Sequence, residues 1–79
     1  MPRETTWDDL EGENAFQVMG TIGRLLRQLE RGVPELDGLR ARYIAEATAA
    51  GGYEGLMDVS HRYAREYLQT TLHVPAERT

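Results

Sequence analysis

The chain has 79 residues, with nine basic and thirteen acidic side chains and a formal net charge of −4. It contains no cysteine, which excludes disulfide bridges and thiolate metal sites, and its length predicts one domain with a small core. Residues 1–14 carry five acids and one arginine, which accounts for the whole negative excess and argues against non-specific nucleic-acid binding by the whole surface.

The first predicted helix covers residues 6–32. A threonine followed three residues later by aspartate indicates its start, and a glycine with a proline beyond it indicates its end. Apolar side chains within about 60° of Ile22 on the helical wheel form a wide face. Gly12 is a weak point, so the regular helix can alternatively begin after it. At up to about 26 residues and about 39 Å, the helix would overhang a compact bundle and need cover from a second copy.

Two glycines interrupt this helix away from its apolar face. Gly20 and Gly23 lie at about 160° and 100° from Ile22 on the wheel. Each costs about 1 kcal/mol relative to alanine in a helix interior. Three explanations stay open, namely a bend, the close approach of a second helix, and tolerated defects. We rank the bend first because the two glycines are only three residues apart.

Two further helices follow. Apolar residues at spacings of three and four predict helices over 34–50 and 53–72, separated by a glycine pair. No strand pattern is present, so the expected fold class is all-α, a small three-helix bundle whose long first helix bends near Gly20 and Gly23. The residues expected to form the core are Ile22, Leu25, Leu26, Leu29, Leu39, Tyr43, Leu56, Ala64, Tyr67 and Leu68.

An arginine ridge is the first candidate for binding a partner. Arg24, Arg27 and Arg31 lie opposite the apolar face of the first helix, where they could meet phosphates, an acidic protein or the acidic N-terminal segment of another copy. The simpler alternative is a solvated face near a helix C-terminus, where positive charge is favoured in any case.

Three aromatic side chains are further candidates. Tyr63 and Tyr67 lie four residues apart on one edge of the third helix, and tyrosine suits a half-buried protein interface. Trp7 lies in the acidic segment, either as a staple onto the bundle or as an anchor for a partner, and the sequence does not separate these two roles.

No catalytic, cofactor or metal site is predicted. His61 and His73 point about 120° apart on one helix, so they cannot bind the same metal ion. Ser60 and His61 are adjacent and therefore diverge on a helix, so they do not form a nucleophile–base pair. No paired acids, phosphate-binding loop or dinucleotide fingerprint occurs. We therefore expect a protein that is not an enzyme and needs no cofactor.

The alternative function is DNA binding. Ala47, Gly51 and Met57 have the spacing of the alanine–glycine–apolar skeleton of a helix-turn-helix, which would cover about residues 43–65. The match is loose, because two glycines occupy the turn and acids open the helix that would read the groove. A small transcriptional regulator is therefore the second hypothesis.

The sequence favours a small protein–protein interaction module, such as an adaptor, an inhibitor or an assembly component, whose protein partner it does not identify. Its expected form is a homodimer through the first helix and the tyrosine edge of the third, so Leu25→Glu should give monomer or unfolded chain. A single helical domain is expected over 1–79, with tails at 1–5 and 75–79. Without a signal-peptide or membrane pattern, the expected compartment is the cytoplasm. The lysine-free, arginine-only composition is typical of GC-rich genomes such as those of actinobacteria and their phages.

Overall fold

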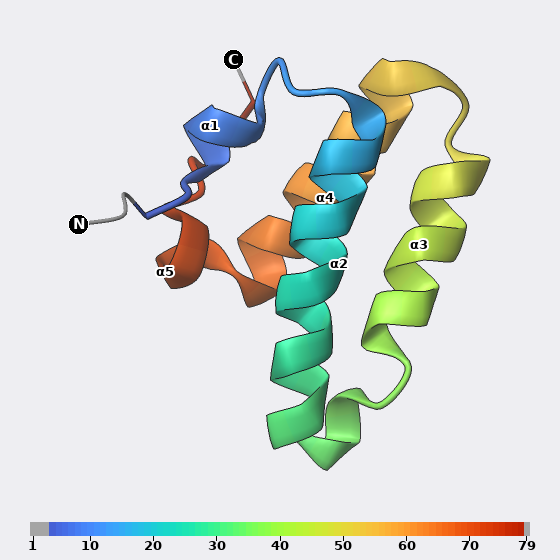
Figure 1. The fold of residues 1–79 in the computed structure, drawn as a ribbon, viewed down its shortest axis with the longest axis vertical. Coiled ribbons are helices and arrows are strands. Elements are labelled where there is room, and N and C mark those ends of the chain that lie inside the picture. Colours follow the sequence, from blue (N-terminus) through green and yellow to red (C-terminus); the bar gives the residue numbers. More distant parts are fainter. Residues whose placement is uncertain (1–3, 79) are drawn as a thin grey trace.

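A computed structural model describes residues 4–78, in which the regular secondary structure is helical and no strand occurs (Figure 1). The all-α fold class is therefore confirmed. α2, α3 and α4 pack against one another, and α1 and α5 lie on the other side of α2 from α3. No helix in the described range is long and apolar enough to cross a membrane. In chain order the elements are α1 (Trp7–Leu10), α2 (Ala15–Gly32), the 3-10 turn η1 (Pro34–Leu36), α3 (Leu39–Ala49), α4 (Gly52–Tyr67) and α5 (Gln69–Leu72).

The single helix expected over 6–32 is wrong, because the chain forms α1 and α2 separately. Between them it turns through Gly12, whose φ of 91° lies in the left-handed region that favours glycine. The side chain of Asn14 caps α2 by accepting a hydrogen bond of 2.9 Å from the backbone N–H of Gln17. The alternative start after Gly12 is right, and the overhang inferred from a continuous helix does not arise.

The helix expected over 34–50 begins later than predicted. η1 and Gly38, with a φ of 84°, precede α3. Gly38 has no side chain with which to cap α3, and Glu30 of α2 takes that role. Its Oε2 accepts from the N–H of Gly38 at 2.9 Å, and its Oε1 accepts from the N–H of Arg40 at 3.1 Å. One carboxylate thus fixes the start of α3 against the end of α2.

The helix expected over 53–72 is also interrupted. α4 ends at Tyr67, and Leu68 has φ −124° and ψ 21°, outside the helical range. α5 then makes one further turn. The break redirects the chain, so that Leu72 and Val74 are buried as well as Leu68. The C-terminal segment therefore closes one side of the core.

The core lies among α2, α3 and α4 and includes side chains of α1. Seven of the expected core residues are buried, namely Ile22, Leu26, Leu39, Tyr43, Leu56, Ala64 and Leu68. Three are only partly buried, namely Leu25, Leu29 and Tyr67. The expected core omitted Trp7, Leu10, Val18, Ala47, Met57, Tyr63, Leu72 and Val74, all of which are buried.

The two glycines of α2 have different surroundings. A Cβ at Gly23 would lie 3.3 Å from Nε of Arg40 and 3.7 Å from Cδ1 of Ile44, so α3 approaches closely there. At Gly20 a Cβ would meet nothing within 4 Å. Close approach of a second helix therefore explains Gly23 but not Gly20, and the bend stays a prediction.

The tail expected over 75–79 is packed as far as Arg78, and residue 79 lies outside the described range. Nη1 of Arg78 lies 2.7 Å from Oδ1 of Asp58, and Nη2 lies 3.2 Å from Oε1 of Glu11 and 3.3 Å from Oε2 of Glu54. These carboxylates, with the Glu11 hydrogen bond first, raise the pKa of Arg78 above its ordinary value. The guanidinium joins the α1–α2 connection to α4.

Candidate protein-interaction surface

Trp7 is buried within the chain, with 1% of its surface exposed. Its Nε1–H donates to Oε2 of Glu11 at 3.1 Å, and its ring meets that of His61 edge to face at a centroid distance of 5.2 Å. Trp7 holds α1 on α4, as the staple alternative expects, and it offers no exposed ring to a partner.

The tyrosine edge is largely engaged by Arg42 of α3. Nε of Arg42 donates to the hydroxyl of Tyr63 at 3.3 Å, and its Nη2 donates to the hydroxyl of Tyr67 at the same distance. Tyr63 is buried and meets Tyr43 edge to face, whereas Tyr67 is partly exposed. Burial raises the pKa of Tyr63, and the hydrogen bond from Arg42 opposes that rise. The edge therefore joins α3 to α4.

The arginine ridge faces solvent. Arg24, Arg27 and Arg31 are exposed and share one face of α2 with Phe16 and Gly20, because all five are spaced by three or four residues. We call these five residues the outer strip. All five residues are exposed within residues 4–78. The side of α2 turned to the core carries Val18, Ile22 and Leu26.

Phe16 is the residue of the strip that sequence reasoning missed. It is 83% exposed, although phenylalanine is usually buried. One turn later Gly20 leaves a bare patch of backbone beside it. The ring borders a shallow depression lined by Asn14, Gln17, Gly20, Thr21 and Arg24. The helical wheel contains the signal, because Phe16 falls about 120° from Ile22 as an apolar residue off the apolar face.

Charge along this surface is polarised. The C-terminal half of the strip carries the three arginines. The N-terminal half adjoins a second depression, where carboxylates of Glu4, Asp9 and Glu13 border Gln17 and Thr21 of α2. Glu4 also borders a further depression with Thr21 and Arg24. The surface thus carries acids beside the N-terminal half of α2 and arginines along its C-terminal half.

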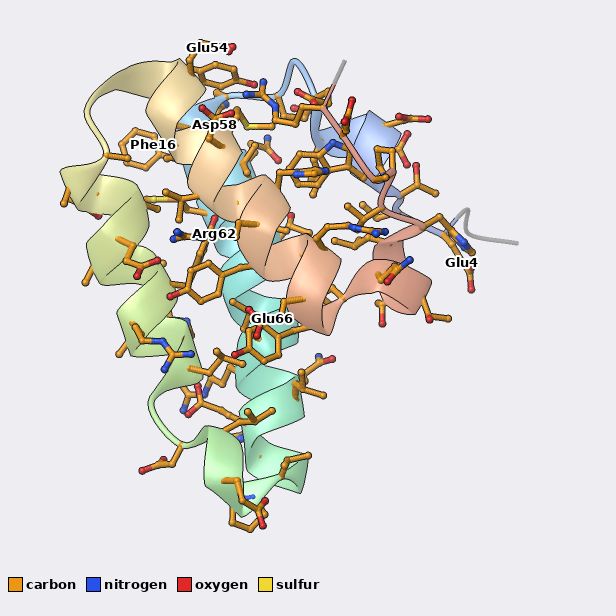
Figure 2. The ribbon with its side chains drawn as sticks, turned by 180° about the vertical axis from the view of Figure 1, so that it is seen from behind. Glu4, Phe16, Glu54, Asp58, Arg62 and Glu66 are labelled. Atoms are coloured by element: carbon orange, nitrogen blue, oxygen red, sulfur yellow. The ribbon has the colours of Figure 1, made fainter. Side chains whose placement is uncertain are left out.

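The geometry of residues 43–65 does not favour the helix-turn-helix interpretation. Contacts pair early α3 with late α4 and late α3 with earlier α4, as in Arg42 with Tyr67 and Glu46 with Arg62, so the helices are antiparallel (Figure 1). Leu56, Met57, Ser60, Tyr63 and Ala64 turn the inner side of α4 into the core. Its outer side carries a row of three acids and one arginine, shown in Figure 2 as Glu54, Asp58, Arg62 and Glu66. The outer side of α4 therefore lacks the basic face that DNA binding would use, and DNA binding stays a hypothesis.

The histidines and acids do not form a metal centre among the described residues, where no group of three or more potential ligands gathers. His61 is engaged elsewhere, since its Nε2 lies 2.9 Å from the carbonyl oxygen of Pro75. The buried hydroxyl of Ser60 pairs with that of Tyr43 at 2.7 Å. These contacts give both side chains structural roles.

No family model, curated protein or solved structure matches this chain.

Proposed function

We propose that this chain is a small, non-catalytic protein-interaction module that binds through the outer strip of α2. The observation that carries the proposal is the 83% exposure of Phe16. Burying a side chain of this kind against a partner is worth about 1.5–3 kcal/mol relative to leaving it in water. An exposed ring on a rigid helix is therefore a source of binding energy that the monomer does not use.

The residues around Phe16 suit a protein partner. Aromatic residues and arginine are the types enriched at protein interfaces. The bare backbone at Gly20 admits a partner close to the helix, and Arg24 and Arg27 add donors for its polar rim. The other candidate residues have roles inside the chain, since Trp7 is buried and Arg42 engages the tyrosine edge.

The proposal is tested by a photoreactive phenylalanine at position 16, introduced in the cells that produce the chain. We expect irradiation to join this position covalently to a protein. The matched control carries the same group at Glu66, an exposed position on the outer side of α4 (Figure 2). Absence of any protein adduct at position 16, or equal labelling at both positions, would contradict the proposal.

A further inference from the structure

The outer strip is symmetric in position about Gly20 but opposite in charge. Phe16 and Arg24 lie about one turn of α2 to either side of it, and Arg27 lies about two turns beyond it. Glu13 stands the same number of residues before Gly20 as Arg27 stands after it, in the turn that precedes α2. A two-fold axis that runs between two copies beside Gly20, perpendicular to α2, would bring each residue of one helix level with the residue equally far on the other side of Gly20 in the second copy. Phe16 then meets Arg24 of the second copy, and Glu13 meets Arg27.

Charge distinguishes the two ways in which two copies of this face can pair. If the α2 helices were parallel, the arginines of one copy would face those of the other, and acids would face acids. In the antiparallel arrangement the basic half of each strip faces the acidic depression that contains Glu4 and Glu13. Opposite charges then meet twice because of the two-fold symmetry.

The centre of the strip suits a close crossing. Gly20 is exposed, and a Cβ there would meet nothing within 4 Å. No close contact within residues 4–78 therefore requires a glycine at this position. Small residues let two helix backbones approach closely. When the two backbones approach closely, the guanidinium of Arg24 in one copy lies against the ring of Phe16 in the other, a favourable contact between a cation and an aromatic face.

We infer that the partner of the outer strip is a second copy of this chain, bound with the two α2 helices antiparallel and crossing at Gly20. This inference rests on the proposed function, because it names the partner of the same surface. α2 has 18 residues and is therefore about 27 Å long. A contact limited to one helix of this length from each copy belongs to the small, transient class of protein–protein interfaces. We therefore expect a dissociation constant in the micromolar range or above.

The test is sedimentation velocity from micromolar to millimolar protein. The wild-type mass rises with concentration from 9.0 kDa towards twice that value. Arg27→Glu and Glu13→Arg each weaken self-association by at least about tenfold, because each places like charges opposite one another. An equimolar mixture of the two variants recovers association, because both positions are acidic in one variant and basic in the other, so opposite charges face one another again.

The matched control for Glu13→Arg is Glu35→Arg, which makes the same charge change at an exposed position outside the strip and leaves association at the wild-type level. Helical circular dichroism verifies that each variant is folded. A single 9.0 kDa species at millimolar wild-type protein overturns the inference. It is equally overturned if the mixture associates no better than the separate variants.

The photoreactive group at position 16 separates failure of this inference from failure of the proposed function. An adduct of two identical chains supports self-pairing. An adduct with a different protein, together with a monomeric wild type, overturns self-pairing and leaves the proposed function standing. No adduct with any protein overturns the proposed function itself.

Discussion

At the scale of single residues, a buried polar contact ties α3 to α4. The hydroxyls of Tyr43 and Ser60 lie 2.7 Å apart, and neither side chain is exposed. Burial raises the pKa of Tyr43, and the hydrogen bond to Ser60 opposes that rise. A buried hydroxyl that loses its partner keeps the cost of leaving water, about 1–3 kcal/mol. The two hydroxyls therefore depend on each other.

Ser60→Ala is expected to lower the free energy of unfolding by about 1–3 kcal/mol, because it leaves the hydroxyl of Tyr43 unpaired. Tyr43→Phe should cost less, since the hydroxyl of Ser60 can turn to a backbone carbonyl of the preceding helical turn. The double variant should cost less than the sum of the two single variants. Urea unfolding of all four proteins measures this coupling, and strictly additive effects would contradict it.

The cap that Glu30 provides for α3 makes stability depend on pH. Hydrogen bonds from the backbone of Gly38, and then of Arg40, lower the pKa of Glu30. Because the folded pKa lies below the unfolded one, the stabilisation is fully present above the unfolded value of about 4.3 and is lost as the pH falls through the folded value. Glu30→Gln should therefore lower the Tm at neutral pH.

The difference in Tm between wild type and Glu30→Gln should shrink as the pH falls below about 4.3. Thermal unfolding followed by circular dichroism across this range measures it. Glu35→Gln removes a carboxylate from exposed η1 and serves as the control. A difference that stays constant down to the acid limit would show that the cap does not depend on the carboxylate's charge.

At the scale of the helices, the same substitution has opposite expected effects at two interior glycines. Gly20→Ala meets open space, so it should stabilise the monomer by up to about 1 kcal/mol. At Gly55 a Cβ would lie 2.5 Å from the backbone oxygen of Ala50, which cannot move without shifting the turn before α4. Gly55→Ala should therefore destabilise the fold by about 1–3 kcal/mol. Chemical denaturation of both variants tests the opposite signs.

Helix type and the apolar face of α2 follow from the sequence, because they depend on periodicity within one segment. The breaks depend on partners far along the chain. The hydroxyl of Tyr53 accepts from the N–H of Gly12 at 3.2 Å and donates to the carbonyl of Glu13 at 2.7 Å, which holds the turn that separates α1 from α2. Local patterns do not reveal such contacts. The exposure of the arginine ridge and of Phe16, in contrast, follows from periodicity within α2, because both lie off its apolar face on the helical wheel.

At the scale of the whole molecule, the two ends of the described chain are joined around Glu11. Its Oε2 accepts from Nε1 of Trp7 at 3.1 Å and from Nε of Arg78 at 3.2 Å, so one carboxylate holds α1 and the C-terminal segment together. Pro75 is held in turn by His61 of α4. These contacts hold α1 and the C-terminal segment against the side of the core opposite α3, where α1 and α5 lie (Figure 1).

Arg78→Ala should loosen both ends of the chain at once. The Arg78 side chain is 19% exposed, and its guanidinium pairs with three carboxylates. Partly exposed pairs contribute up to about 1 kcal/mol each. We expect a lower Tm and a shift of Trp7 fluorescence to longer wavelength, because Glu11 loses the cation that fixes it beside the indole. Added salt should narrow the difference in Tm from wild type, because salt screens the ion pairs.

Arg65→Ala removes an arginine from α4 as the control. Unchanged fluorescence and Tm in Arg78→Ala would show that the apolar contacts of Val74 and Leu72 hold this segment without the ion pairs.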